Sequence, residues 1–432
     1  MVDALFQMFQ RRALSKGTLL LTIALSLGLS GCQSSGSPSA GTASSGPSAS
    51  STASASPGAS ASSAPGASES PSAAPSEQPG DGGGASASPV PAGTPAPSVS
   101  MGTVTALRLA DAKSGWAGGE GWIARTDNGG SDWTVQHSGS FTVKQLFALN
   151  GDKVWATLDA GGGKGLRLIG SADGGKHWNS IGTVPNEGFL HFTSDRTAFS
   201  GNAMTTDGGK TWTKLGVPDG VVGDVYFHDA NNGWAVQEAK GEYRFLHSSD
   251  KGRTWQTVMK RTSEVSPLGS VIRSTGKNDA WIEVVGGSGM TQTSYALFHT
   301  SDGGKSWLPA IVKHGAGSGP APGFSMEDGK YPSGTGAGPG DLYVVNPQTA
   351  IIGGQCQACD KPNTIAETTD GGKSWAASKS EFAGYGDQFI AATDAQHIWL
   401  VATDAAEPSV LYTTSDGGKS WKKARTFAKP GA

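Results

Sequence analysis

The residues best suited to chemistry in this sequence are a pair of cysteines and a pair of carboxylates. Cys356 and Cys359 form a Cys-Gln-Ala-Cys run, a spacing that suits a disulfide, a redox pair or half of a metal site. Glu327 and Asp328 are adjacent in a glycine-rich stretch, which is weak support for acid–base catalysis. The sequence has no Ser-His-Asp, zinc or phosphate-loop pattern. We therefore interpret the chain as non-catalytic, with no metal and no cofactor.

A third cysteine, Cys32, follows a segment with the features of an export signal. Basic residues at 11, 12 and 16 precede residues 17–29, which are uncharged and mostly apolar but too short to span a bilayer. The run Leu-Ser-Gly-Cys at 29–32 resembles the lipobox of bacterial lipoproteins, whose cysteine is diacylated. The resemblance implies a signal over residues 1–32, a lipid on Cys32 and a place on the extracytoplasmic face of the cell membrane. An ordinary signal followed by an unrelated cysteine is the alternative.

Export also bears on the cysteine pair. With Cys32 lipidated, an even remainder in an oxidising compartment favours a disulfide between Cys356 and Cys359. A redox-active pair is less favoured because the helix of a thioredoxin-like site is missing. Half of a metal site is also less favoured, since no second Cys/His pair lies nearby.

Residues 33–100 consist almost entirely of Ser, Ala, Pro and Gly, with three charged residues. Such a segment has almost nothing to bury, so no core can offset the entropy of the chain. We predict that residues 33–100 form a disordered tether between the anchor and a folded domain over residues 101–432.

The folded domain contains one motif seven times, Ser/Thr-x-Asp-x-Gly-x-Ser/Thr-Trp, which we call the box. In box 1 an asparagine replaces the aspartate and Asp132 replaces the second hydroxyl residue, and in box 2 His177 stands at that second position. Boxes 1 to 7 span residues 126–133, 171–178, 205–212, 248–255, 300–307, 368–375 and 414–421.

A bulky residue precedes each box and opens an apolar run, and five positions before it lies a residue typical of turns. These lead residues are Trp116, Trp155, Phe199, Trp234, Trp281, Ile351 and Trp399. The boxes and the lead residues account for twelve of the 13 tryptophans, and only Trp122 lies outside, where we expect a core ring.

The final tryptophan of the box recurs every 34 to 68 residues, enough for four short strands in each unit. Repeats of this length and composition predict the blades of a β-propeller. We therefore expect an all-β fold, a seven-bladed propeller of four-stranded antiparallel blades. In the second repeat the predicted strands are 142–148, 153–158, 165–171 and 177–182, and each box is the turn between the third and fourth strands.

The box has the chemistry of a folding device. Its carboxylate can accept hydrogen bonds from N–H groups of its own turn, its glycine can adopt positive φ, and its tryptophan can bury a ring between strands. The predicted structural residues are Asn128, Asp173, Asp207, Asp250, Asp302, Asp370 and Asp416, with Trp133, Trp178, Trp212, Trp255, Trp307, Trp375 and Trp421.

The box resembles the Asp-box, or BNR, repeat of sialidases, some endoglucanases, sortilin-type receptors and photosystem II assembly-factor propellers. The Gly-Trp-Ala element at 115–117 and 233–235 is most similar to the last group. The resemblance covers residues 101–432. It implies a non-enzymatic role in assembling or stabilising a membrane protein complex, although one fold carries many functions.

The sialidase members of this family need an arginine cluster and carry an Arg-Ile-Pro element. That element is absent here, and the arginines are scattered. We expect solvated surface positions for Arg108, Arg125, Arg167, Arg196, Arg244, Arg253, Arg261, Arg273 and Arg425. Endoglucanases with these boxes use two propellers, whereas this chain has the length of one. Binding or hydrolysis of a surface glycan stays as the alternative function.

The expected binding site lies on one of the two faces of the propeller. Hairpins between second and third strands and connections between blades share one face, which we call the loop face, and the boxes lie on the other, the box face. The longest connection, 312–340, contains Phe324, Met326 and Tyr331, which are our candidate partner-binding residues. The net charge of −3 indicates no nucleic-acid partner, and we expect a protein of the envelope or membrane.

Overall fold

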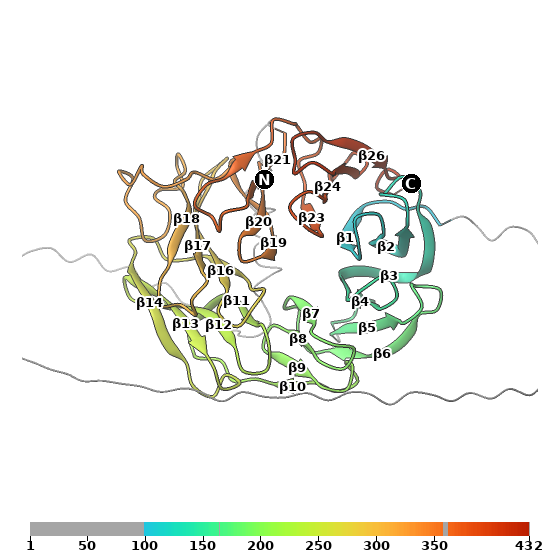
Figure 1. The fold of residues 1–432 in the computed structure, drawn as a ribbon, viewed down its shortest axis with the longest axis horizontal. Helices are drawn as coiled ribbons and strands as arrows, with labels where there is room; N and C mark the ends of the chain where they lie inside the picture. The colour runs from blue at the N-terminus through green and yellow to red at the C-terminus, as the bar shows by residue number, and fades with distance from the viewer. Residues whose placement is uncertain (1–98, 164, 357–361, 432) are drawn as a thin grey trace, which may run out of the picture. The chain divides into compact units, whose positions relative to one another are not determined.

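The structure is a computed structural model that describes residues 99–163, 165–356 and 362–431. Within these ranges every regular element is a β-strand, and the strands form six antiparallel sheets around a centre (Figure 1). None of the residues described forms a helix long and apolar enough to cross a membrane. The predicted signal, Cys32 and the predicted tether lie outside the described residues, apart from its last two residues.

The first sheet contains β1 (Val104–Leu109), β2 (Gly115–Thr126), β3 (Thr134–Ala148), β4 (Val154–Asp159), β5 (Leu166–Ser171) and β6 (Asn179–Val184). The second contains β7 (Leu190–Phe192), β8 (Ala198–Ser200), β9 (Ala203–Thr205) and β10 (Thr213–Lys214). The third contains β11 (Val221–Phe227), β12 (Gly233–Ala239), β13 (Glu242–Ser248) and β14 (Gln256–Thr262).

The fourth sheet contains β15 (Gly269–Arg273), β16 (Ala280–Ser288), β17 (Thr293–Thr300) and β18 (Leu308–Lys313). The fifth contains β19 (Gly338–Asn346), β20 (Thr349–Gln355), β21 (Thr364–Thr368) and β22 (Ala376–Ala377). The sixth contains β23 (Gln388–Ala392), β24 (Ile398–Ala402), β25 (Val410–Thr414) and β26 (Lys422–Thr426).

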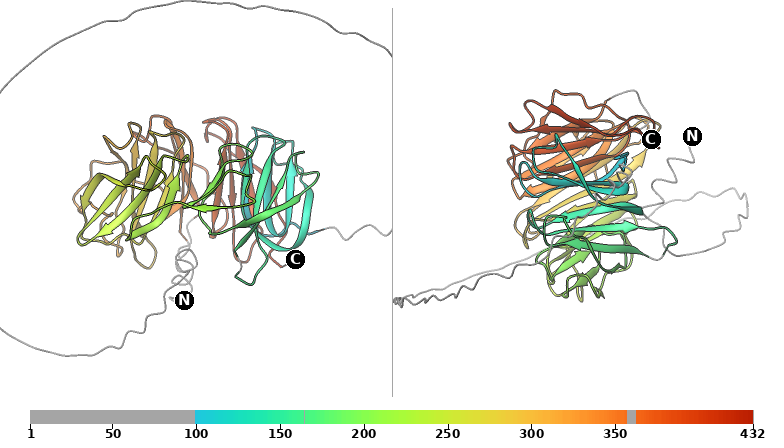
Figure 2. Two further views of the ribbon diagram at one scale, coloured as in Figure 1. Left: turned by 90° about the horizontal axis from the view of Figure 1, so that it is seen from below. Right: turned by 90° about the vertical axis from the view of Figure 1, so that its right-hand side faces the viewer.

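These sheets are the blades of a propeller. The first strands β1, β7, β19 and β23 lie toward the centre, and the last strands β10, β14 and β26 lie at the periphery (Figure 1). In the edge-on views of Figure 2 the strands run between two opposite faces. The all-β propeller fold is therefore confirmed, and β4, β5 and β6 match the strands predicted in the second repeat to within two residues.

The prediction of seven separate four-stranded blades is wrong, because the strands form six sheets. Boxes 1 and 2 both belong to the first sheet. β3 pairs with β2 through residues 134–142 and with β4 through residues 142–148, so no break separates the first two repeats. Between the other sheets a connection without strand structure interrupts the pairing. The sequence repeats could be counted, but the continuous strand that joins two of them could not be foreseen.

Side chains that accept backbone hydrogen bonds fix the turn before each lead residue. The Oδ1 atom of Asp111 accepts N–H bonds of 2.8 Å from Lys113 and from Ser114, and similar turns form at Asn150, Ser194, Asp229, Asn346 and Asp394. In the remaining repeat the corresponding residue, Gly276, has no side chain. There the N–H of Thr275 donates at 2.8 Å to the carboxylate of Asp279, which lies on the other side of the turn. These local bonds set where each second strand begins.

The core lies between neighbouring sheets. Each lead residue shares an apolar cluster with the box tryptophan of the next repeat around the ring: Trp234 with Trp307, for example, and Trp281 with Trp375. The two rings meet edge to face, with centroids 5.8 Å and 6.2 Å apart in these two pairs. Each repeat therefore supplies its lead residue to the contact with the next repeat and its box tryptophan to the contact with the preceding one. This explains why a lead residue and a box recur together.

The ring closes by side-chain packing between the first and sixth sheets. β26 completes the sixth sheet with strands of its own repeat, so the termini exchange no strand. Trp122 is fully buried, as expected for a core ring, and stacks on Phe427 at 5.8 Å. The N–H of Ala428 donates to the carbonyl of Met101 at 2.8 Å.

Candidate binding face

The boxes form nearly identical hydrogen-bonded turns. In box 5 the hydroxyl of Thr300 donates to Asp302 Oδ1 at 2.8 Å, and Asp302 also accepts the N–H of Ser306 at 3.0 Å and its hydroxyl at 2.6 Å. These bonds lower the pKa of Asp302 to about 2, and the bond from the Ser306 hydroxyl has the largest effect. The same bonds form in boxes 3, 4, 6 and 7, and box 2 differs only in that His177 takes the place of the second hydroxyl.

Box 1 keeps this geometry with the donor and acceptor exchanged. The Asn128 amide donates to the Asp132 carboxylate at 2.8 Å, whereas a hydroxyl donates to the aspartate in boxes 3 to 7. Asn128 Oδ1 still accepts the N–H of Asp132 at 2.9 Å. The two departures from the motif therefore compensate each other.

The box tryptophans divide into three groups by what their indole N–H meets. Five of them donate to the carbonyl of the glycine at the fifth position of their own box, at 2.9–3.2 Å: Trp133, Trp212, Trp255, Trp307 and Trp421. Trp375 donates instead to the carbonyl of Ala310 in the preceding sheet at 3.0 Å. The buried indole nitrogen of Trp178 has no hydrogen-bond partner among the described residues.

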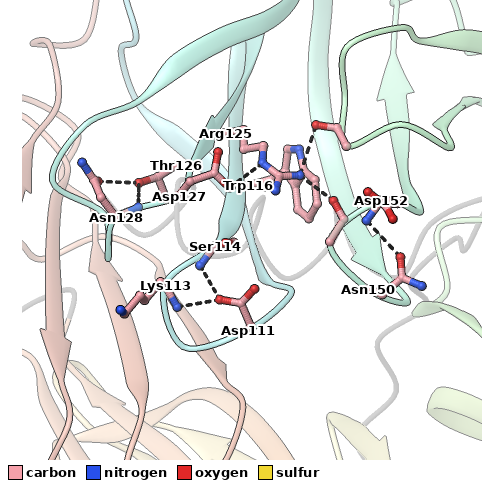
Figure 3. A network of polar contacts seen from close by, with 12 residues as sticks. Asp111, Lys113, Ser114, Trp116, Arg125, Thr126, Asp127, Asn128, Asn150 and Asp152 are labelled. Carbon is pink, nitrogen blue, oxygen red and sulfur yellow. Dashed lines mark hydrogen bonds and ion pairs between the residues drawn. The ribbon is translucent and has the colours of Figure 1, made fainter.

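A shared set of contacts places the boxes on one face. The N–H of Gly129 in box 1 donates to the carbonyl of Lys113 at 2.8 Å, and boxes 2, 3, 5, 6 and 7 make the same bond to the first turn of their own repeat. Arg125 joins two repeats, because its guanidinium donates to the carbonyls of Gly151 and Gly174 at 2.5 and 3.2 Å (Figure 3). Its Nε also donates to Asp127, which lowers the pKa of that carboxyl. The box face is thus built from polar, hydrogen-bonded turns.

The loop face carries most of the exposed apolar side chains. Seven large apolar residues are exposed among those described, and all but Leu149 lie before a first strand or in a hairpin of the loop face. They are Val99, Val217, Leu268, Met290, Met326 and Tyr385. Met290 is 89% exposed at the β16–β17 hairpin, and Met326 is 59% exposed in the connection from β18 to β19.

The connection from β18 to β19, residues 314–337, is fastened to the sheets. Arg261 Nε donates to the carbonyl of Gly323 at 2.6 Å, and the Tyr243 hydroxyl donates to the carbonyl of Pro322 at 3.1 Å. Near the end of the segment Lys313 Nζ donates to the carbonyl of Gly334 at 3.1 Å. The connection therefore presents its side chains from a held backbone.

The three candidate partner-binding residues have different surroundings. Phe324 is buried, with the Arg261 guanidinium 3.8 Å from its ring centre and the Tyr331 ring at 5.2 Å. Tyr331 is half-buried beside it, so only Met326 is largely exposed. The neighbouring Asp328 accepts the N–H of Ser325 at 2.9 Å, which lowers the pKa of the Asp328 carboxyl. Phe324 and Tyr331 support the segment that displays Met326.

Of the two cysteines, the structure describes only Cys356, whose Sγ lies 3.6 Å from the carbonyl of Thr291 in the β16–β17 hairpin. Cys356, at the end of β20, is buried and disulfide-bonded. Cys359, its expected partner, lies outside the described residues. The residues that are described hold no group of three or more His, Cys, Asp or Glu side chains placed to bind a metal ion.

At least four arginines do not have the solvated surface positions expected for them, and Arg261, packed on Phe324, is one of these. Arg108 lies on β1 with its guanidinium 4.5 Å from the Phe147 ring centre. Arg273, on β15, pairs with Asp224 at 3.1 Å and lies over Phe189 at 4.1 Å. Arg125 is the bridging residue of Figure 3, with 16% of its side chain exposed. The expectation is wrong here because inner strands and turns face other repeats, which a linear sequence does not display.

His191, on the inner strand β7, completes the cluster around Arg273. It is buried and stacks on Tyr226 with ring centres 4.9 Å apart. Burial, with the nearby positive charges of Arg273 and Arg108, lowers its pKa to about 4. Its ring is therefore neutral near pH 7. Stacked rings and paired charges of this kind stabilise the middle of the ring and offer no nucleophile with a base beside it.

Solved structures with a similar fold include two of YCF48. One, titled as YCF48 bound to D1 peptide, is 15% identical over 74% of this chain and 92% of that chain, with a TM-score of 0.43. The other, from Cyanidioschyzon merolae, is 14% identical over 75% and 95%, with a TM-score of 0.44. A Niastella koreensis GH74 enzyme is 13% identical over 76% and 73%, with a TM-score of 0.31.

No family model and no curated protein matches this sequence. At identities of 13–15% and TM-scores below 0.5, the similar structures carry no argument about function. The similar structures also include an ulvan lyase, so enzymes occur among them beside YCF48. The function must be argued from the residues of this chain.

Proposed function

We propose that this chain is a non-catalytic propeller that binds a protein partner through its loop face at the outer surface of the cell membrane. The observation that carries the proposal is the unequal distribution of exposed apolar side chains, six on the loop face and one on the box face. The excess of exposed apolar side chains on one face makes that face the better candidate for an interaction surface.

The strongest part of this surface surrounds the fourth sheet. Met290 and Met326 are unbranched and polarizable, and such side chains adapt well to a partner surface. The backbones that display them are linked, because the N–H of Ala316 donates to the Gln292 side chain at 2.7 Å. A held backbone with flexible side chain ends lowers the entropy lost on binding.

The sequence supports an extracytoplasmic site for this interaction. The lipobox resemblance at Cys32 supports a membrane location, and the Ser, Ala, Pro and Gly composition of residues 33–100 supports their proposed role as a tether between the membrane and the propeller. The partner we propose is therefore a protein of the envelope or membrane, with the propeller acting in its assembly or stability. YCF48 with its D1 peptide is an example of a similar fold that binds a protein segment.

Site-specific crosslinking in intact cells tests the proposal. A photoreactive amino acid replaces Met290 or Met326 on the loop face, and Leu149 on the box face is the matched control. We expect one discrete protein adduct from each loop-face position and none from position 149. Equal adducts from the two faces, or none from either loop-face position, would contradict a partner on the loop face. A glycan array and a hydrolase panel on the purified propeller test the glycan alternative.

A further inference from the structure

One inter-sheet contact differs from the others. In boxes 1 to 6 the glycine at the fifth position of the box is buried against other parts of the ring, and an added Cβ atom would come within 3 Å of a neighbour. At Gly372 in box 6, for example, that neighbour is Ala310 of the preceding sheet at 2.6 Å. At Gly418 in box 7 the nearest atoms belong to Trp421 of the same box, at 3.5 Å, and the glycine is only half-buried.

The lead residue of the fifth sheet explains the difference. Six lead residues are Trp or Phe, and the seventh is Ile351. In the third and fourth sheets the cross-strand partner of the lead tryptophan stacks on its indole: His247 lies 4.2 Å from Trp234, and His299 lies 4.0 Å from Trp281. At the corresponding position of the fifth sheet Glu367 pairs with Ile351, and there is no indole to stack on.

The smaller side chain leaves a cavity of about 280 Å³, which we call the box-7 pocket. Ile351, Ile365 and one side of Trp421 make it largely apolar, and the exposed residues Lys379 and Lys419 also line it. An engineered cavity of about 150 Å³ is enough to bind benzene. The box-7 pocket therefore has room for a one- or two-ring aromatic group.

The pocket also contains an unsatisfied acceptor. Glu367 lines the pocket: its Oε1 is covered by protein atoms and has no hydrogen-bond partner within the described part of the chain, and its Oε2 lies beside Gly417 of the pocket lining. Burial, with a contribution from the Asp394 carboxylate, raises the pKa of Glu367 to about 7. A half-buried carboxyl group without a donor is costly, so a ligand that donates to its Oε2 atom gains more than its apolar contacts alone.

We propose that the box-7 pocket binds an aromatic ring that carries a hydrogen-bond donor, the chemistry of an indole or a phenol. The ring takes the place that lead tryptophans fill in other repeats, above Ile351 and beside Trp421. Its N–H or O–H donates to Glu367. This site is separate from the loop face and does not depend on the partner proposed for it.

Calorimetric titration with indole and N-methylindole, which differ in the donor, tests the proposal. We expect the folded domain to bind indole about tenfold more tightly than N-methylindole, the effect of one hydrogen bond to a half-buried carboxyl group. Glu367→Leu should remove this preference. Thr413→Leu, a change at the corresponding position beside Trp399, should leave it intact, since a lead indole fills that site. Equal affinity of the wild-type protein for the two compounds, or no binding at millimolar concentration, would overturn the proposal.

Filling the pocket gives an independent test. Ile351→Trp should abolish indole binding and raise the melting temperature. If this variant does not fold, isoleucine methyl NMR of the wild-type protein replaces it: indole should shift the signals of Ile351 and Ile365 but not that of the distant Ile123. Shifts spread over all isoleucines would contradict a single site. Comparing free tryptophan with a peptide that contains an internal tryptophan then shows whether the ligand is a small molecule or a side chain of a protein.

Discussion

The two faces of this propeller are built on different principles. The box face repeats one hydrogen-bonded turn seven times, and its carboxylates are satisfied within a few residues of their own position. The loop face has connections of unequal length, and the longest is held by contacts with residues far away in the sequence. The comparison indicates that stability is concentrated on the box face, whereas the loop face is free to vary and to bind.

The largest expected effect comes from a buried link on the box face. His299 contacts Asp279 at 3.0 Å through one ring nitrogen and the Gly371 carbonyl of box 6 at 2.9 Å through the other. His299→Ala should lower the free energy of unfolding by about 3 kcal/mol, because it leaves the buried Oδ1 of Asp279 without its partner and opens a cavity. Urea denaturation measures the change. A loss below 1 kcal/mol would show that the link contributes little.

A single box should have a smaller effect. Asp302→Ala removes an acceptor of three hydrogen bonds, and we expect a loss of about 1–2 kcal/mol because the turn is exposed and water replaces part of what is lost. The same denaturation series measures it, with Asp219→Ala, in a connection of the loop face, as the control. Equal losses from the two substitutions would remove the distinction between the faces.

One box should become more stable on mutation. In box 4 Lys251 stands where the other boxes have glycine, and it adopts a φ of 68°. A side chain in the left-handed region costs about 1 kcal/mol, so Lys251→Gly should raise the free energy of unfolding by about 0.5–1 kcal/mol. Lys210→Gly, in box 3, has no such strain to release and is the control. No gain at position 251 would argue that its contacts offset the strain.

The pH dependence of stability should separate Glu367 from exposed carboxylates. Its pKa is about 7 in the fold and near 4.5 when unfolded, so the folded state holds the extra proton between these values. Stability from this group is present below about pH 4.5 and is lost as pH rises through 7. Glu367→Gln should therefore raise the melting temperature more at pH 8 than at pH 5. The exposed Glu187→Gln variant should show no such difference.

The smallest effect on stability is expected on the loop face. The double variant Met290→Ser and Met326→Ser should change the free energy of unfolding by less than about 0.5 kcal/mol, because both side chains are exposed. Its effect should appear instead as weaker recovery of a crosslinked partner, with the reactive group at Leu268. A large loss of stability would place these methionines among the structural residues and weaken the case for a binding face.

Local features of this fold were well predicted from the sequence, and features that depend on distant contacts were not. The boxes, the turns before the lead residues and the strands of the second repeat follow from the spacing of Asp, Gly and Trp. The joining of the first two repeats in one sheet does not, because it depends on how far β3 continues. The clustering of Arg108 and Arg273 near the centre is likewise a property of inner strands that meet only in the ring.

The candidate sites show the same limit. Met326 is exposed, as a docking residue must be, but Phe324 of the same segment is buried against Arg261. The composition of the segment does not show which of the two side chains is exposed. The box-7 pocket had a visible signal, since Ile351 is the one lead residue without a ring. The pocket that results lies beside Gly418 of the next sheet, and its position could be found only from the packing between the sheets.

The way the ring closes has a consequence for the order of its parts. Because β26 belongs to its own sheet and the two ends meet at Met101 and Ala428, the covalent start of the fold is arbitrary. A short peptide joining these ends, with a new opening at the exposed Gly241 between β12 and β13, should give a circular permutant with the same arrangement of sheets. If the permutant folds, the order of the repeats along the chain is not a requirement of folding.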